Sequence, residues 1–103
     1  MKAGLRQLAD VDRVIHEPAR LLIVSLLYAL KEADFVFLQQ ESQLTRGNLS
    51  SHLVRLEEAG YVTMEKSFKG RVPLTEYSIT RDGKRALERY LDHMEALIKA
   101  MKG

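Results

Sequence analysis

The spacing of apolar residues along this 103-residue chain predicts a series of helices with one β-prone interval. Apolar side chains that recur every three or four residues lie on one face of a helix. Such spacing occurs over about residues 5–15, 18–33, 45–59 and 80–101, so we expect a helix in each of these segments. A briefer helix is expected over about residues 38–44.

Residue types at the ends of these segments support the prediction. Pro18 suits the first position of a helix, because the amide hydrogen that proline lacks would be unpaired there. Thr45 and Thr80 can cap the helices that follow them, since a threonine hydroxyl accepts a hydrogen bond from a free backbone N–H of the first turn. Gly60 is expected to end the helix over residues 45–59 in a left-handed conformation.

Residues 61–79 are expected to form a β hairpin. Two β-prone arms, 61–68 and 74–79, flank a short stretch that contains Gly70. A separate β-prone run, 35–38, is predicted as a single edge strand. The predicted fold class is therefore mostly α with a small β hairpin. Central helices followed by a hairpin and a long final helix have the order of a winged helix-turn-helix domain.

The helix predicted over residues 45–59 has an apolar and a polar face. At 100° per residue, one side carries Leu49, Leu53 and Leu56. The other side carries Gly47, Asn48, Ser51 and Arg55, with His52 on its flank. In the major groove of DNA, asparagine can pair with adenine and arginine with guanine. The polar face is therefore a candidate DNA-reading surface, and the alternative reading is an ordinary solvated helix face.

Basic residues gather at the expected tip of the hairpin. The stretch 66–73 contains Lys66, Lys69 and Arg71 and no acidic residue. Such a tip can contact backbone phosphates or the minor groove, and the alternative reading is a solvated charged turn. The net charge of the chain is only +2, so the local placement of charge, and not its sum, favours a nucleic-acid partner.

Four stretches of the chain resemble parts of small winged helix-turn-helix transcriptional regulators of the MarR-like and ArsR-like groups. Residues 44–62 closely resemble their recognition helix, and residues 66–73 resemble their wing. Residues 77–84 resemble the wing strand and the start of the last helix. Residues 16–23 look like the opening of the first core helix, and the resemblance covers about residues 14–95.

The resemblance implies a transcriptional regulator, usually a repressor, that binds double-stranded DNA as a homodimer at a pseudo-palindromic operator. It places residues of the recognition helix and of the wing in the groove or against its phosphates. The helix residues are Thr45, Arg46, Asn48, Ser51, His52 and Arg55. The wing residues are Lys66, Lys69 and Arg71.

The last predicted helix has an apolar stripe. Its members are Leu87, Leu91, Met94, Ile98 and Met101, alternately four and three residues apart. This is the spacing of a seam between paired helices, and the alternative for some of these side chains is that they cover the core of the domain itself. We expect it to pair with the same helix of a second chain and with Leu5 and Leu8, so that N- and C-terminal helices form the dimer interface. Such a dimer presents its recognition helices about 34 Å apart.

Composition narrows the function classes further. The chain has no cysteine, which removes disulfides and thiolate chemistry, and its 46% of hydrophobic residues suffice for one domain over residues 1–103. The longest apolar stretch, residues 21–30, is roughly half as long as a membrane span. No signal peptide is predicted, so the expected location is the cytoplasm.

Several alternatives stay open from the sequence alone. A winged helix can also serve as a protein-interaction or RNA-binding module, because fold does not fix function. No paired carboxylates, phosphate loop or activated nucleophile point to an enzyme, and no cofactor or metal is predicted. Asp12 and His16, one turn apart on the expected N-terminal helix, could hold a metal only together with a partner chain. The sequence does not define an effector ligand.

Overall fold

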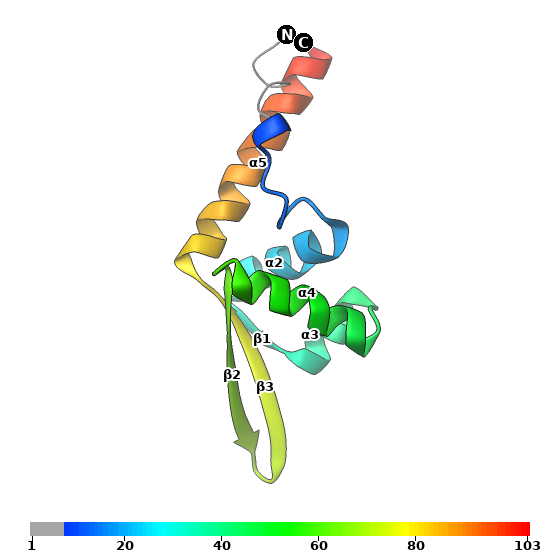
Figure 1. Cartoon of the computed structure of the whole chain (residues 1–103), viewed down its shortest axis with the longest axis vertical. Coiled ribbons are helices and arrows are strands. Elements are labelled where there is room, and N and C mark those ends of the chain that lie inside the picture. Colours follow the sequence, from blue (N-terminus) through cyan, green and yellow to red (C-terminus); the bar gives the residue numbers. More distant parts are fainter. Residues whose placement is uncertain (1–7) are drawn as a thin grey trace.

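The helices within residues 18–58 form a helical body, from which a β hairpin and the last helix extend (Figure 1). The hairpin and one short strand make up a three-stranded sheet. The computed structural model describes residues 8–103. The elements are η1 (Leu8–Asp10, a 3-10 turn), α2 (Pro18–Leu30), β1 (Glu32–Asp34), α3 (Phe35–Ser42), α4 (Arg46–Glu58), β2 (Val62–Lys69), β3 (Val72–Ile79) and α5 (Arg81–Lys102). The predicted fold class, mostly α with a β hairpin, is confirmed by this order.

The strands form one antiparallel sheet in the order β1-β3-β2. Strands β2 and β3 pair along their whole length and end with Lys69 opposite Val72, so a two-residue turn joins them. Gly70 in this turn has a φ of 66°, a left-handed conformation that glycine adopts without strain. Strand β2 is as long as the predicted 61–68 but shifted by one residue toward the tip, and β3 begins two residues before the predicted 74–79, because residues beside the tip continue the hydrogen-bonded ladder.

The segment between α2 and α4 differs from the prediction. Lys31 has a φ of 73°, which ends α2 slightly earlier than expected. The edge strand predicted over residues 35–38 is wrong, because these residues form the first turn of α3 and the edge strand β1 lies just before them. Oδ1 of Asp34 accepts a hydrogen bond from the backbone N–H of Phe37 at 2.8 Å. This cap starts the helix and outweighs the β propensity of the residues that follow.

The N-terminal helix predicted over residues 5–15 is wrong in the part that the structure describes. Only η1 is helical there, and residues 11–17 form no regular helix. The Asp12 carboxylate accepts hydrogen bonds from the backbone N–H groups of Val14 at 2.9 Å and Ile15 at 3.1 Å. An aspartate that bonds the backbone two and three residues ahead stabilises a turn instead of a continuing helix.

The core lies where α2, α3 and α4 pack against the sheet and the first half of α5. Leu49, Leu53 and Leu56 of α4 are fully buried, which confirms the apolar face predicted for this helix. Their burial fixes the orientation of α4 and turns its polar face to solvent. The other large, fully buried side chains are Ile15, Ile23, Val24, Leu27 and Leu38.

Three predicted helix boundaries are confirmed. Oγ1 of Thr45 accepts a hydrogen bond from the backbone N–H of Asn48 at 3.2 Å, and so caps α4. Oγ1 of Thr80 does the same for Gly83 at 2.9 Å at the start of α5. Gly60 has a φ of 80° and reverses the chain after α4. These local contacts fix both ends of α4 and its connection to the hairpin.

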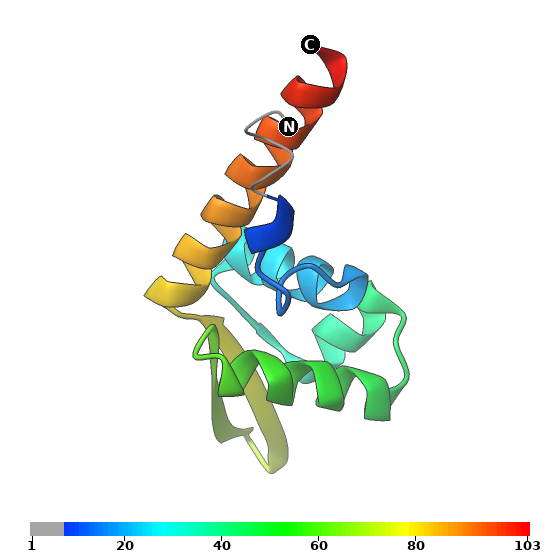
Figure 2. The same cartoon turned by 45° about the horizontal axis from the view of Figure 1, so that its top comes forward.

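The wing, defined here as β2, β3 and their turn, and α5 extend in opposite directions from the helical body (Figure 1). The molecule is therefore 58 Å long but only 25 Å by 21 Å across. The 22-residue α5 runs beyond the body, where η1 lies beside it (Figure 2). No helix within residues 8–103 is long and apolar enough to cross a membrane.

Tyr61 links the N-terminal segment to the junction between α4 and the wing. Its hydroxyl donates a hydrogen bond to Oδ2 of Asp12. Burial and this hydrogen bond raise the pKa of Tyr61 to about 12. The protonated phenol therefore contributes to the stability of the fold at neutral pH.

We expect this contribution to disappear at alkaline pH. A tyrosine whose pKa rises on folding stabilises the folded state fully below its ordinary pKa of 10.0, and the effect is lost as the pH rises to about 12. Thermal unfolding of the wild type and of Tyr61→Phe over this interval measures the loss. The variant should lose less stability than the wild type, and parallel losses would contradict the assignment.

Candidate nucleic-acid interface

The polar face of α4 is open to solvent. The exposed residues among those predicted to contact DNA from this helix are Thr45, Arg46, Asn48, Ser51 and Arg55. Asn48, Ser51 and Arg55 lie three and four residues apart, so they follow one side of the helix from its first turn to its last. This side offers amide, hydroxyl and guanidinium groups, which are the donors and acceptors that base edges pair with. Their contact with DNA stays a prediction.

Unlike these exposed residues, His52 contacts side chains at the start of α2. Its Nδ1 lies 3.1 Å from Nη1 of Arg20, which can donate a hydrogen bond to it, and 3.6 Å from Oε2 of Glu17. Burial alone would raise the pKa of Glu17, but hydrogen bonds from the backbone N–H groups of Arg20 and Ala19 hold the pKa below its usual value. We therefore assign His52 to the contact between α4 and α2, and this geometry gives its predicted role in the groove no support.

The wing presents its predicted basic residues, Lys66, Lys69 and Arg71, at exposed positions. Lys69 and Arg71 flank Gly70 at the tip, far from the helical body (Figure 1). Among the described residues, none of the three basic side chains forms an ion pair. Phe68, on the adjoining position of β2, is 72% exposed. The tip therefore displays positive charge that no ion pair within residues 8–103 neutralises.

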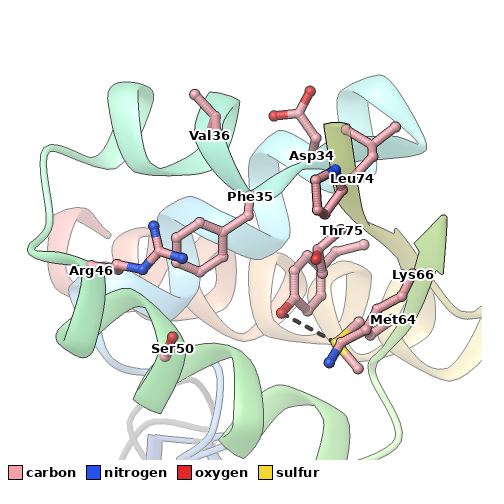
Figure 3. A pocket seen from close by; sticks show the side chains of 11 residues that line it. Asp34, Phe35, Val36, Arg46, Ser50, Met64, Lys66, Leu74 and Thr75 are labelled. Atoms are coloured by element: carbon pink, nitrogen blue, oxygen red, sulfur yellow. Dashed lines mark hydrogen bonds between the residues drawn. The ribbon is translucent and has the colours of Figure 1, made fainter. Parts of the chain in front are cut away.

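A hollow of about 360 Å³ lies between α4, the start of α3 and the wing (Figure 3). Arg46 and Ser50 line it from α4, and Lys66 lines it from β2. Apolar side chains, among them Val36 and Met64, line other parts of it. The start of α4 and the wing therefore border one continuous surface.

Arg46 lies over the ring of Phe35 at the edge of this hollow. The guanidinium carbon is 5.3 Å from the ring centroid, within the range of a cation–π interaction (Figure 3). The sequence indicated Arg46 but neither Phe35 nor Ser50. The contact of Phe35 with Arg46 depends on how α3 packs beside α4, so the sequence pattern does not predict it. Ser50 could have been predicted, because a residue four positions after Arg46 lies on the same side of a helix.

A family model described as a winged helix DNA-binding domain matches residues 19–98 of the chain. The matched region includes all of α4, the hollow and the wing. The chain belongs to the winged helix DNA-binding domain family. Helix α4 therefore occupies the position of the recognition helix in the winged helix fold, and the hairpin occupies the position of the wing.

Similar proteins cover nearly the whole winged helix chain. The uncharacterized protein MJ0432 of Methanocaldococcus jannaschii is 39% identical over 88 residues, which span 84% of this chain and 95% of that protein. A transcriptional regulator homologue of Pyrococcus horikoshii is 32% identical, with a TM-score of 0.87 over 93% of this chain and 97% of that chain. A MarR family regulator of Silicibacter pomeroyi is 22% identical, with a TM-score of 0.67 over 96% of this chain and 64% of that chain. The predicted likeness to MarR-like regulators is confirmed in the fold.

Asp12 and His16, the pair that could have held a metal ion together with a partner chain, both contact other side chains in this winged helix domain. The Asp12 carboxylate is bonded to the Tyr61 hydroxyl, and Nδ1 of His16 lies 2.9 Å from the hydroxyl of Tyr90. Asp12 and His16 also do not share a regular helix. Within residues 8–103, no group of three or more His, Cys, Asp or Glu side chains is arranged to hold a metal ion.

Part of the predicted dimer stripe belongs to the core of this chain. Leu87 is 3% exposed because the first half of α5 packs against the helical body, which corrects its assignment to the dimer interface. Met94 is partly buried against the same core. The predicted partner residue Leu5 lies outside the described residues. Leu8 belongs to η1, but its side chain is not among those that the structure describes.

The second half of α5 keeps an exposed apolar surface. Leu91 and Ile98 are each 52% exposed, and Met101 is 71% exposed. Their spacing of seven and three residues places them on one side of the helix. Exposed apolar stripes of this kind are typical of association surfaces. Their role in a dimer stays a prediction.

Proposed function

We propose that this winged helix protein is a sequence-specific transcriptional regulator that binds double-stranded DNA as a homodimer and represses the genes whose operators it occupies. The observation that supports the proposal best is the hollow, because the recognition helix and the basic wing border it together. A helix and a wing on one surface fit two neighbouring grooves of a duplex, the major groove for α4 and the minor groove for the wing tip. The whole chain, residues 1–103, acts as one domain in the cytoplasm.

The residues divide between base reading and backbone contact. Asn48 and Arg55 pair with base edges, and Ser51 lies between them on the same side of α4. Thr45 and Arg46 contact phosphates near the start of α4. The wing contributes Lys66, Lys69 and Arg71, whose charges act on backbone phosphates and on the minor groove without reading a base directly. Sequence preference therefore comes mainly from α4, and much of the affinity comes from the wing.

The homodimer forms through the second half of α5, on the stripe of Leu91, Ile98 and Met101. A two-fold pairing through these helices gives a pseudo-palindromic operator whose half-sites are one turn apart, about 34 Å. Repression follows because a dimer that covers one face of the operator excludes other proteins from that DNA. The regulated genes are those next to such sites.

Gly47 provides a test of how closely α4 approaches DNA. A Cβ added at this position would meet no atom of the chain within 4 Å, so the fold does not require glycine there. Alanine is favoured over glycine in a helix by up to about 1 kcal/mol. We expect Gly47→Ala to raise the melting temperature while it weakens DNA binding. Higher stability with unchanged or tighter DNA binding would contradict close approach at this residue.

Removal of the charges at the wing tip tests the DNA-binding surface itself. We expect the double variant Lys69→Ala, Arg71→Ala to bind duplex DNA more weakly and to depend less on salt. The slope of log K against log salt concentration should fall by about 0.9 for each phosphate that the variant no longer neutralises. Fluorescence anisotropy with a labelled duplex, over about 50–200 mM salt, measures both quantities.

The matched control is Lys99→Ala, Lys102→Ala, which removes the same charge from the last turn of α5, far from the wing. It should leave the slope unchanged. Equal slopes for the wild type and the wing variant would remove the wing from the interface. Titration with an RNA duplex of the same sequence separates a DNA-binding from an RNA-binding protein. Absence of binding to either duplex would favour a protein-interaction module.

A further inference from the structure

The hollow between α4 and the wing has the chemistry of an anion site. Arg46 and Ser50 lie one turn apart on α4, and Lys66 lies on β2, so two cations and a hydroxyl border it (Figure 3). Its volume of about 360 Å³ equals that of about twelve water molecules at about 30 Å³ each. This is enough for a phosphate group together with an adjoining sugar.

The acidic side chain among the lining residues is already used by the fold. Asp34 caps α3, since its Oδ1 accepts the hydrogen bond from the backbone N–H of Phe37 at 2.8 Å. Two cations against one carboxylate leave the hollow positively charged. A phosphodiester carries one negative charge and matches this balance. The apolar side chains of Val36 and Met64 suit a sugar better than a second charged group.

The ring of Phe35 holds one of the cations in place. Phe35 is partly buried and packs against the core, so its ring is fixed by the fold. Arg46 lies above it, with the guanidinium carbon 5.3 Å from the ring centroid. A free arginine side chain loses rotamer entropy when it binds a phosphate, and a guanidinium that is already stacked loses less. The contact therefore prepares Arg46 for an anion in the hollow.

We propose that the hollow receives the sugar–phosphate strand that separates the major groove read by α4 from the minor groove entered by the wing, and that Phe35 positions Arg46 on its phosphate. The inference rests on the proposed function. If α4 occupies one groove and the wing tip the next, a single strand of backbone must cross the space between them, and that space is the hollow. Arg46, Ser50 and Lys66 are then its ligands.

Substitutions at Phe35 separate positioning from folding. We expect Phe35→Leu to weaken binding to duplex DNA about two- to fivefold per half-site, the size of an exposed cation–π interaction. Phe35→Tyr keeps the ring and should restore wild-type affinity. Phe37→Leu is the matched control, because Phe37 is also partly buried on α3 and packs against the same core. Combined with Arg46→Gln, Phe35→Leu should cause no further loss, whereas a merely structural role would add one.

A neutral phosphate locates the contact on the DNA. A duplex that the protein binds is made with one methylphosphonate at a time in place of a backbone phosphate, and each duplex is titrated with the wild type and with Arg46→Gln. The wild type should lose affinity at one position per half-site, between the two contacted grooves. Arg46→Gln should show no loss at that position, because the partner charge is already absent. Its salt slope should also be lower by about 0.9 per half-site.

The outcomes distinguish this inference from the proposed function. If the wing variant weakens binding but no methylphosphonate position depends on Arg46, the phosphate site is wrong and DNA binding by the wing stands. If Phe35→Leu and Phe37→Leu weaken binding equally, Phe35 does not position Arg46. If the wild type binds no duplex, the inference and the proposed function both fail.

Discussion

Replacement of both Leu91 and Ile98 by glutamate is expected to abolish the dimer and to lower affinity for the operator by about 100-fold or more. Each side chain is 52% exposed on α5, so the substitution changes the outer surface of the helix and not the core of the chain. Charged groups in the seam repel across the two-fold axis and must be desolvated. A monomer then binds one half-site and loses the gain from binding two linked half-sites. Sedimentation equilibrium distinguishes the 11.8 kDa chain from a particle of twice that mass.

The control for this experiment is Arg85→Glu, at an exposed polar position of the same helix that lies outside the stripe. It changes the net charge by the same two units as the leucine and isoleucine substitutions together, so an effect confined to the apolar positions cannot come from charge. Both variants should melt close to the wild type, because no buried side chain is altered. A wild type that is monomeric both free and on its operator would contradict the dimer.

Gly83→Ala is expected to destabilise the fold by about 2 kcal/mol or more. A Cβ at this position would lie 2.3 Å from the carbonyl oxygen of Tyr61 and 3.0 Å from Cγ1 of Ile79. The carbonyl oxygen is held in place, since it accepts a hydrogen bond from the backbone N–H of Thr80 at 3.0 Å. Either α5 or the chain before β2 must therefore move. Urea denaturation measures the free energy of unfolding.

Gly47→Ala makes the same chemical change in α4, where the added Cβ meets open space. It should unfold at an equal or higher urea concentration than the wild type, so the pair separates steric conflict from helix propensity. A Gly83→Ala variant as stable as the wild type would show that α5 does not pack so tightly on Tyr61.

Local signals explain why much of the fold could be predicted. The caps at Thr45 and Thr80 and the left-handed Gly60 depend only on neighbouring residues, and the structure has all three. The two wrong elements also have local causes, namely the side-chain hydrogen bonds of Asp12 and Asp34 to backbone N–H groups ahead of them. In residues 5–15 the bonds of Asp12 oppose the helix that the apolar spacing favours, and in residues 35–38 the bond of Asp34 opposes the strand that β propensity favours. Apolar spacing and β propensity alone do not reveal that these hydrogen bonds determine the local structure.

Part of the candidate site could likewise be predicted from local spacing, and part of it depends on packing between elements. Helical spacing predicts that Asn48, Ser51 and Arg55 share an exposed side, because three leucines fix the opposite side. The contacts of His52 with α2 and of Phe35 with Arg46 join separate elements and depend on tertiary packing. Spacing alone therefore cannot reveal them.

The stripe on α5 illustrates the same limit. Leu87 and Leu91 are consecutive members of the same regularly spaced stripe, yet Leu87 lies in the core of its own chain and Leu91 is half exposed. An apolar stripe specifies a face of a helix, but it does not specify whether the same chain or a second chain covers each turn of that face. The turns of α5 beside the helical body are covered by the core, and the turns beyond the end of the body are not.

Selection from a pool of random-sequence DNA duplexes, over about 50–200 mM salt, tests whether the protein is a sequence-specific dimeric regulator. The purified protein is incubated with the pool, and retained duplexes are amplified and sequenced. We expect enrichment of a two-fold symmetric site whose half-sites are about 34 Å apart, with affinity that falls steeply as salt rises. Retention of no duplex even at the lowest salt concentration, or retention without any sequence preference, would contradict a sequence-specific dimeric regulator.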